Sequence, residues 1–293
     1  MKKKWIINID EVPQNITIEK FIRTLTDINK HIEHLKSKTP DYLSVPINFS
    51  IEALRSDLLS ALKDIASYSF EYKGREEKFE SYVSTSLTYN PSAIDNISSD
   101  PHQSGLGSKL YSEGSSNFYE ATAAQKNTYA DTYSYFERTP LSNHGEIKIL
   151  LDSFERTLIR SRVSIIKSGL SESTDLKYLW HKDESIFLNL RVNIPIQSNE
   201  NYVIQMIDDQ KSDSEIIEFQ LKTGNAFIYD TQKLHRPLCK TLNTTDRINM
   251  ICGVSPWFDY HEEQKAWISN DYYGELHPFD MFMQGQISKL IKA

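Results

Sequence analysis

The sequence has few cysteines, no excess of positive charge and no long hydrophobic run, and each absence argues against a class of protein. Only Cys239 and Cys252 occur in 293 residues, too few for a disulfide framework and without the CxxC spacing of a zinc site. Both lie in strand-like sequence, where we expect ordinary buried residues. Lys and Arg number 33 against 40 Asp and Glu, and the net charge of −7 argues against a nucleic-acid-binding protein, which usually carries a basic face.

Segments that span a membrane or direct secretion are also lacking. No apolar run approaches the roughly 18 residues that cross a bilayer. The opening MKKKWIINIDEVPQ has no apolar stretch long enough for a signal peptide, because Asp10 and Glu11 interrupt it. We therefore expect a cytoplasmic protein that binds neither membranes nor nucleic acids. Its 39% hydrophobic and 25% charged residues are typical of a soluble globular chain.

The N-terminal half is predicted to be helical and rich in loops. Residues 21–35, 51–68 and 146–162 place apolar side chains at helical spacing along one face. Residues 90–132 are rich in Ser, Asn, Gly and Tyr and show little periodicity. A stretch of this length is usually functional or mobile, so a substrate-facing lid and a simple surface excursion both stay open.

Eight short runs rich in β-branched and aromatic residues follow between residues 163 and 254. They are VSIIK, YLWHKD, IFLNLRVNIPIQ, YVIQMIDD, EIIEFQL, NAFIYD, HRPLCKTL and RINMICGV. Turn-like segments such as SNEN and KTGN separate them, as expected of strands. This density of strands indicates an antiparallel barrel or jelly roll.

The whole chain is therefore predicted to be one α+β unit, in which helices precede a small β-barrel. We expect a helical and loop-rich N-terminal part over residues 1–145 and the barrel core over 146–260. A C-terminal extension over 261–293 follows, with a short helix in its QISKLIKA segment.

Two of the runs alternate between apolar and polar side chains. In IFLNLRVNIPI, Asn189, Arg191 and Asn193 share one face, and in RINMICGV the same holds for Arg247 and Asn249. Successive side chains point to opposite sides of a strand, so each run presents one apolar and one polar face. The polar face could meet solvent outside an antiparallel sheet or line a polar barrel interior. Alternation alone leaves both arrangements open.

The segment WHKDE contains the first candidate metal ligands. His181 and Asp183, two residues apart, face the same side of one strand and can bind one ion together. His235 begins another run 54 residues later, and Arg247 follows after 12 more. Two histidines and one carboxylate on one face of an octahedron leave positions open and suit non-haem Fe(II). An HxD pair alone is weak evidence, but HxD, His and Arg within eight predicted strands form a fairly strong pattern.

In these motifs the sequence resembles the 2-oxoglutarate- and Fe(II)-dependent oxygenases. More narrowly, it resembles the aspartyl/asparaginyl β-hydroxylase-like group, which includes several proline hydroxylases. The resemblance covers residues 145–260 and is carried by SIIKSG, WHKD, LRVNIPI, GNAFIYDTQKLH and DRINMICGV. It implies a double-stranded β-helix with supporting helices, Fe(II) as the metal, and 2-oxoglutarate and O2 as cosubstrates.

The iron ligands that this resemblance implies are His181, Asp183 and His235. The aspartyl β-hydroxylases themselves have a small residue in place of the acidic ligand, so Asp183 places this chain with the members that have a complete triad. With glycine or alanine at this position a halide could enter the iron site. We therefore predict hydroxylation of a C–H bond rather than halogenation.

The resemblance also implies residues that bind the cosubstrate. Arg247 would hold the distal carboxylate of 2-oxoglutarate by a bidentate pair, and Ser164 would donate a hydrogen bond to the same carboxylate. Arg191 matches an arginine that faces the cosubstrate or the substrate carboxylate. Asn193 stands where the family often has a histidine, and we place it among the cosubstrate-binding residues.

Two other functions stay open at this point. A cupin-like metalloenzyme could use the triad without 2-oxoglutarate, and Arg247 and Ser164 would then have no cosubstrate to hold. The barrel could also be a non-catalytic binding module. For an oxygenase, the expected substrate is a small molecule, an amino acid or a peptide residue; the oligomeric state is open.

Overall fold

The computed structural model describes most of the chain, namely residues 6–8, 32–64, 68–71, 78–89, 133, 135–169, 180–208, 215–241 and 244–291. The strands in these residues form one seven-stranded sheet, two three-stranded sheets and one two-stranded sheet. Residues 90–132, the expected lid or excursion, lie outside the described part of the chain.

The seven-stranded sheet, called here the large sheet, forms the centre of the molecule. Its strand order is β2-β11-β8-β13-β7-β4-β3, and all neighbouring pairs are antiparallel. The strands are β2 (Tyr42–Pro46), β3 (Tyr68–Glu71), β4 (Lys78–Ser86), β7 (Arg162–Ile166), β8 (Leu190–Gln197), β11 (Asn225–Tyr229) and β13 (Arg247–Val254).

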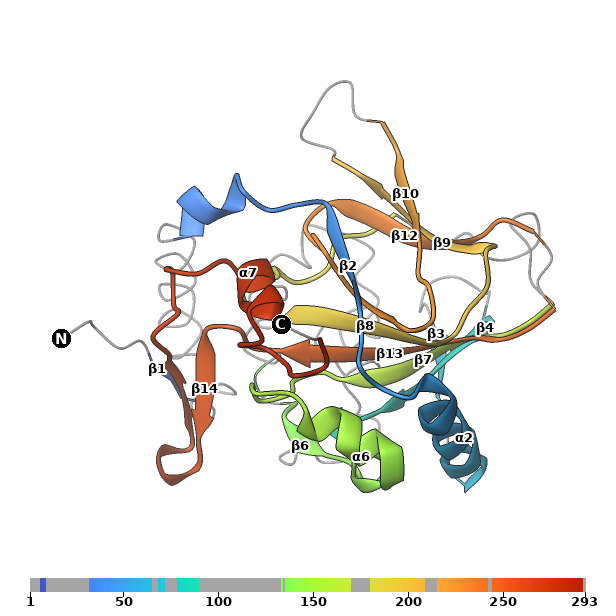
Figure 1. Ribbon diagram of the computed structural model, residues 1–293, viewed down its shortest axis with the longest axis horizontal. Coiled ribbons are helices and arrows are strands. Elements are labelled where there is room, and N and C mark those ends of the chain that lie inside the picture. The colour runs from blue at the N-terminus through green and yellow to red at the C-terminus, as the bar shows by residue number, and fades with distance from the viewer. Residues whose placement is uncertain are drawn as a thin grey trace.

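A second sheet, called here the small sheet, lies over one face of the large sheet (Figure 1). It is antiparallel in the order β10-β9-β12, with β9 (Tyr202–Ile207), β10 (Ile217–Gln220) and β12 (Leu234–Cys239). Buried apolar side chains join the two sheets, because residues of β9, of β10 and of the position just after β10 cluster with Phe227 of β11. These residues are Ile204, Met206, Phe219 and Leu221.

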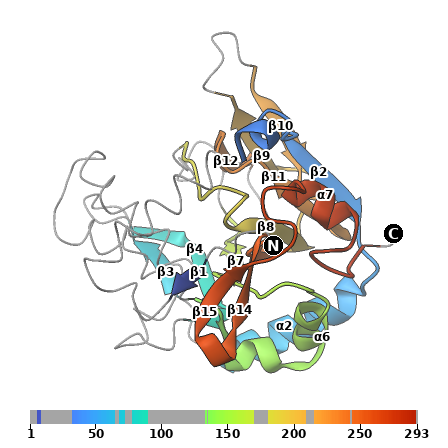
Figure 2. The same cartoon turned by 90° about the vertical axis from the view of Figure 1, so that its left-hand side faces the viewer.

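Helices α2 (Ile51–Ala61) and α6 (Gly145–Asp152) cover the opposite face of the large sheet (Figures 1 and 2). Helix α2 begins at Ser50, whose side-chain oxygen accepts a hydrogen bond from the backbone N–H of Ala53, as expected of an N-cap. The apolar faces of both helices pack with β8 and β13 in the main hydrophobic core. Its members include Leu54, Leu58, Ile147, Leu150, Val192, Ile194, Met250 and Cys252.

The remaining elements lie at the ends of the large sheet. They are β1 (Ile6–Asn8), β14 (Phe258–His261) and β15 (Ala266–Ser269) in one sheet, β5 (Thr88–Tyr89) and β6 (Glu137–Arg138) in another, helix α7 (Pro278–Met283), and the 3-10 helices η1 (Leu62–Asp64), η2 (Pro140–Asn143) and η3 (Glu262–Gln264). Among the helices that the structure describes, none is both long and apolar enough to traverse a bilayer.

Antiparallel sheets combined with helices agree with the predicted α+β class. Seven of the eight predicted runs contain strands, β7 to β13 in chain order. Of the run YLWHKD, residues 180–183 are described, and His181 forms a single β-bridge there. Cys239 and Cys252 are buried free thiols, as expected.

The N-terminal half was wrongly predicted to be mainly helical, because it also supplies β2, β3 and β4 to the two edges of the large sheet. The predicted helix at 51–68 ends at Ala61, and β3 begins at Tyr68. Strand β4, with the sequence KFESYVSTS, is rich in charged and hydroxyl side chains, so it lacks the apolar character that identified the later strands. Of the predicted helix at 21–35, residues 32–35 are described and are helical.

Two further helix predictions were wrong at their C-terminal ends. The segment at 146–162 is helical only to Asp152, because Phe154 and Leu158 form β-bridges to Ser288 and Val254. The apolar residues whose spacing suggested a helix therefore belong in part to extended backbone that pairs with distant segments of the chain. The expected helix in QISKLIKA is absent from its described residues 286–291, in which Ser288 and Ile291 form bridges.

Candidate metal centre

A direct backbone pair between His181 and strand β12 brings the candidate ligands together. The N–H of His181 donates to the carbonyl oxygen of His235 at 3.1 Å, and the N–H of His235 donates to the carbonyl oxygen of His181 at 3.0 Å. The two imidazole rings therefore lie side by side, with 4.5 Å between their centroids. Asp183 joins them because its own N–H donates to the carbonyl oxygen of Thr231 at 2.9 Å.

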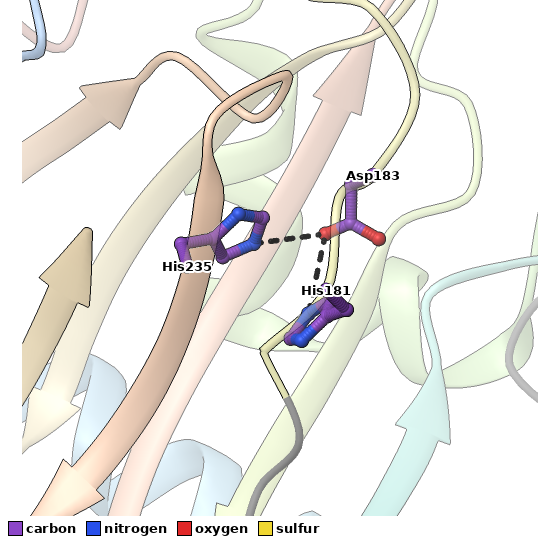
Figure 3. A group of neighbouring side chains, drawn as sticks. All are labelled: His181, Asp183 and His235. Atoms are coloured by element: carbon purple, nitrogen blue, oxygen red, sulfur yellow. Dashed lines mark ion pairs between the residues drawn. The ribbon is translucent and has the colours of Figure 1, made fainter. Parts of the chain in front are cut away.

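The three side chains converge on one point (Figure 3). Asp183 Oδ2 lies 3.4 Å from His235 Nε2 and 3.9 Å from His181 Nε2, and one donor atom from each residue lies within 4.8 Å of the others. A metal bound about 2.1 Å from each donor needs neighbouring donors about 3 Å apart, so a small inward movement of the side chains completes the site. The donor set of two imidazoles and one carboxylate fits non-haem Fe(II).

His235 is fixed by a hydrogen bond on the far side of its ring. Its Nδ1 lies 3.0 Å from the carbonyl oxygen of Lys233, and its side chain is 2% exposed. Donation from Nδ1–H to this carbonyl leaves the Nε2 lone pair directed at the metal position, the arrangement that usually orients a histidine ligand. His181 is 39% exposed, so the site opens to the outside next to this residue.

The guanidinium of Arg191 neutralises the carboxylate of Asp183. Its Nη1 donates to Asp183 Oδ2, the oxygen that also faces both histidines. Burial by itself would raise the pKa of Asp183, but the positive charge of Arg191 and the contacts with His235 and His181 together outweigh it and hold this pKa well below its usual range. Asp183 is therefore ionised, as a metal ligand must be.

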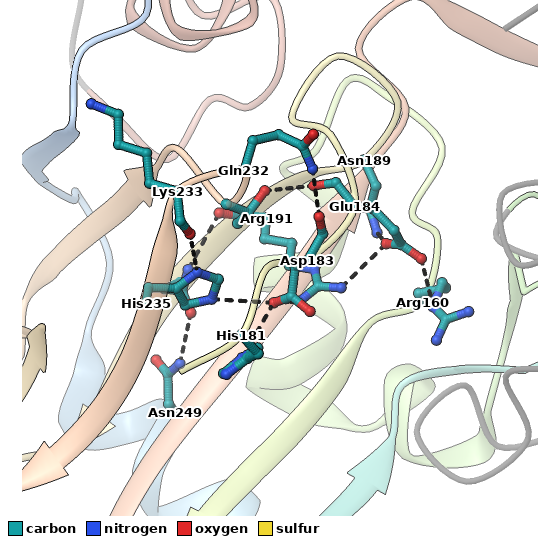
Figure 4. A network of polar contacts seen from close by, with 12 residues as sticks. Arg160, His181, Asp183, Glu184, Asn189, Arg191, Gln232, Lys233, His235 and Asn249 are labelled. Atoms are coloured by element: carbon teal, nitrogen blue, oxygen red, sulfur yellow. Dashed lines mark hydrogen bonds and ion pairs between the residues drawn. The ribbon is translucent and has the colours of Figure 1, made fainter. Parts of the chain in front are cut away.

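Behind Asp183, a second buried carboxylate joins two arginines (Figure 4). Glu184 Oε2 accepts from Arg191 Nη2 at 3.2 Å and from Asn189 Nδ2 at 2.6 Å, while Glu184 Oε1 lies 3.4 Å from Arg160 Nε. Arg191 was expected to face the cosubstrate or the substrate carboxylate. Its guanidinium instead contacts two acidic side chains of the protein itself, which positions Asp183.

The polar faces of β8 and β13 line the space between the two sheets, which decides between the alternatives that the sequence left open. Asn189, Asn193 and Asn249 are 1–3% exposed, and Arg247 is 6% exposed. The opposite faces of the same strands pack in the main core below helices α2 and α6. The polar residues are therefore interior and not solvent-facing.

Arg247 and Ser164 lie on this interior face, on adjacent strands. Ser164 of β7 pairs with Asn249 of β13, and Arg247 lies two residues before Asn249, so the Ser164 and Arg247 side chains are diagonal neighbours. Asn193 is engaged within the protein: its Oδ1 accepts from Asn249 Nδ2 at 2.9 Å, and its Nδ2 donates to the carbonyl oxygen of Arg191 at 3.3 Å. All seven predicted site residues thus belong to one region.

Sequence reasoning missed the residues that support this region, above all Glu184 and Arg160. Glu184 directly follows Asp183, but a carboxylate beside a metal ligand is not informative until its partners are known. Arg160 lies 24 residues earlier, and only the fold brings it to Glu184. Gln232, which donates to the backbone carbonyl of Asp183 at 2.6 Å, carried no recognisable signal.

Gly253 of β13 allows the Arg160 segment to approach the sheet. The N–H of Ile159 donates to the carbonyl oxygen of Gly253 at 2.7 Å. A Cβ at position 253 would lie 2.2 Å from the carbonyl oxygen of Ile159 and 2.6 Å from Asn189 Oδ1. Glycine is required here by this close approach of backbone and side chain.

No protein-family model and no curated protein matches the sequence. Among solved structures, the non-heme alpha ketoglutarate dependent epimerase SnoN from nogalamycin biosynthesis is 10% identical, with 79% of this chain and 82% of that chain covered and a TM-score of 0.40. A prolyl hydroxylase from Trichoplax adhaerens, in complex with a hypoxia inducible factor oxygen degradation domain peptide fragment, is 7% identical, with 86% and 96% covered and a TM-score of 0.37. Vicilin from the hazelnut Corylus avellana is 9% identical, with 39% and 26% covered and a TM-score of 0.24. Since all three TM-scores lie below 0.5, these likenesses carry no argument about function.

Proposed function

We propose that this chain is a cytoplasmic 2-oxoglutarate- and Fe(II)-dependent oxygenase that hydroxylates a C–H bond of a small molecule, an amino acid or a peptide residue. The observation that carries the proposal is the convergence of His181, Asp183 and His235 around one point. Two imidazoles and one carboxylate, with the rest of the coordination sphere open, suit Fe(II) oxygenase chemistry.

The strand order supports a double-stranded β-helix. Successive core strands alternate between the sheets: β7 and β8 belong to the large sheet, with the His181 bridge to the small sheet between them. Strands β9 and β10 follow in the small sheet, β11 in the large, β12 in the small and β13 in the large. This winding around a polar interior is that of a jelly roll. It supports the resemblance to the aspartyl/asparaginyl β-hydroxylase-like group, carried by LRVNIPI and DRINMICGV.

Each proposed role follows from the contacts of the side chain. His181, Asp183 and His235 would hold Fe(II), and bound Fe(II) supplies the oxidation of the substrate C–H bond by O2 and 2-oxoglutarate. The Lys233 carbonyl directs His235 Nε2 inward, and Arg191 keeps Asp183 ionised. These contacts orient the ligands before the metal arrives.

The cosubstrate would lie along the interior face of the large sheet. Arg247 is buried and carries a fixed positive charge, which suits the distal carboxylate of 2-oxoglutarate, and Ser164 is its diagonal neighbour. Asn193 lies between this pair and Arg191, so it borders the cosubstrate position. Asp183 fills the place at which a halide could enter, which favours hydroxylation.

Anaerobic titration with Fe(II) and 2-oxoglutarate tests this proposal. The wild-type protein should develop the visible absorption band of the chelated metal, and the His181→Ala variant should not. Absence of the band in the wild type would overturn the oxygenase assignment.

The Arg247→Gln variant separates the oxygenase from a cupin-like enzyme that needs no 2-oxoglutarate. Loss of the pair between Arg247 and the distal carboxylate should cost about 2 kcal/mol or more of binding free energy. The 2-oxoglutarate concentration that gives half of the band should therefore rise by roughly 30-fold or more. An unchanged half-saturation would favour the cupin-like alternative. A screen for succinate release against amino acids and peptides, with His181→Ala as control, would then identify the substrate.

A further inference from the structure

The polar interior face of the large sheet extends past the metal centre to Arg162, the first residue of β7. Arg162 pairs with Ser86 of β4 on one side and with Ile251 of β13 on the other, and Ile251 pairs with Asn193 of β8. Side chains directly opposite each other in an antiparallel sheet lie on the same face. Arg162 therefore shares the interior face with Asn193.

The electrostatics around Tyr229 give an independent placement of Arg162. Burial and the charge of Asp183 raise the pKa of the Tyr229 hydroxyl to about 12, although the guanidinium groups of Arg191, Arg247 and Arg162 act in the opposite direction. Arg162 thus lies within electrostatic reach of Tyr229. The Tyr229 ring in turn contacts the ring of His235, with 5.2 Å between the centroids. Arg162 therefore faces the same interior as the candidate metal centre.

Arg162 differs from Arg191 and Arg160 in having no acidic partner among the described residues. Within the described residues it forms no ion pair, and its buried Nε has no hydrogen-bond acceptor. The neighbouring hydroxyl groups of Ser84 and Ser86 are also buried without partners, and Ser84 is 0% exposed. By contrast, Arg191 and Arg160 are both paired with Glu184. A buried guanidinium nitrogen and buried hydroxyls without partners are costly, so they point to an anionic ligand.

We propose that Arg162, together with Ser86 and Ser84, binds the carboxylate of the substrate, an inference that rests on the proposed oxygenase function. Arg191, the earlier candidate for this role, is engaged by Asp183 and Glu184. Arg247 lies four residue pairs from Arg162 along the β7–β13 ladder, roughly 13 Å at the usual rise per residue, so the two arginines bind different carboxylates.

The position of Arg162 also limits the size of the substrate. Two interstrand spacings, roughly 10 Å, separate β7 from β8, whose Arg191 contacts Asp183. About three extended residues span such a distance. The substrate is therefore a carboxylic acid the size of an amino-acid derivative or a short peptide bound through its C-terminus, and not an internal segment of a folded protein.

Anomalous diffraction from crystals of the full chain soaked in sodium bromide tests the anion site directly. Bromide should bind next to Arg162 and the Ser86 hydroxyl in the wild type and in Arg162→Lys, and it should be lost in Arg162→Gln. Arg55→Gln, which removes an exposed arginine of α2, should leave the peak unchanged. Absence of bromide at Arg162 in the wild type would overturn the proposal.

The Fe(II)-2-oxoglutarate absorption band separates this inference from the function on which it rests. Arg162→Gln should keep the wild-type band with an unchanged half-saturating 2-oxoglutarate concentration. A raised half-saturation in Arg162→Gln would assign Arg162 to the cosubstrate and overturn the substrate role. A wild-type protein that binds bromide at Arg162 but forms no band would disprove the oxygenase function and leave the anion site standing.

Discussion

The two faces of the large sheet show the same alternation of side chains but have opposite environments. On β8, Val192 and Ile194 point to helices α2 and α6, while Arg191 and Asn193 point to the small sheet. Both faces are buried, so burial alone does not distinguish them. On the helix side, burial of apolar surface stabilises the fold. On the interior side, each polar group needs a specific partner, and this requirement places charges around the metal centre.

The largest expected effect is the loss of metal binding on the interior side in His235→Ala. The substitution removes one of three ligands, so Fe(II) affinity should fall by more than about 100-fold, beyond the usual effect of altering a group that only supports a ligand. Isothermal titration under anaerobic conditions would measure it. His261→Ala, at an exposed histidine of β14, is the matched control. Equal affinities in the two variants would contradict the assignment of His235 as a ligand.

The matching change on the helix side is Ile194→Ala, which should affect stability instead of metal binding. Ile194 is 0% exposed, so its truncation leaves a cavity and should lower the free energy of unfolding by about 2–5 kcal/mol. Urea denaturation would measure this loss. Ile216→Ala, at a side chain that is 53% exposed, should change stability by less than about 0.5 kcal/mol. Weakened Fe(II) binding in folded Ile194→Ala would show that the two faces are not independent.

His277 is a polar group within the apolar surroundings of α7, and it makes stability depend on pH. Its Nδ1 accepts from the N–H of Phe279 at 3.1 Å, and burial lowers its pKa to about 4, although Asp280 acts in the opposite direction. The unfolded chain binds a proton near pH 6.5 and the folded chain only near pH 4, so His277 disfavours folding progressively as pH falls through this window, by at most about 3 kcal/mol. In His277→Asn, which keeps an N-cap acceptor, the fall in unfolding free energy between pH 6.5 and 4 should be smaller. Identical pH profiles from urea denaturation would exclude His277 as the source.

The smallest effect concerns the interior pair Asn193–Asn249. Asn193→Ala removes the acceptor for Asn249 Nδ2 and should lower the unfolding free energy by about 1 kcal/mol. A double-mutant cycle with Asn249→Ala should show that the two losses are coupled. Additive losses would mean that the bond contributes little. A large change in 2-oxoglutarate affinity in Asn193→Ala would give Asn193 a direct cosubstrate contact instead.

The sequence predicted the barrel strands well because their physical signals are local. Strands β8 and β13 alternate clearly, and turn residues separate the runs, so the elements were found within a few residues of their observed bounds. The edge strand β3 was missed because an edge strand needs less apolar character, and its neighbour β4 was missed because it is rich in charged and hydroxyl side chains. Whether the polar faces of β8 and β13 are exposed or interior depends on the small sheet that covers them. The sequence of a single run cannot reveal that packing.

For the site, the pattern of His181, Asp183 and His235 was sufficient to predict their convergence, because ligand spacing reflects strand geometry. The partners of charged groups were not predictable in the same way. Arg191 was expected to meet a carboxylate of the cosubstrate or the substrate, and it meets Asp183 and Glu184 because residues 184–189 turn back toward the metal centre. Such pairings depend on long-range packing.

The close approach of Ile159 and Asn189 to Gly253 determines which residues position 253 can accept. A single methyl group at position 253 would displace Ile159 and Asn189, the first adjacent to Arg160 and the second bonded to Glu184. Arg160 and Glu184 lead through Arg191 to Asp183. In a library that allows all twenty residues at this position, we expect only glycine to survive selection for activity. A residue that has no side chain, and so contributes none to the metal centre, would then be as intolerant of replacement as a metal ligand.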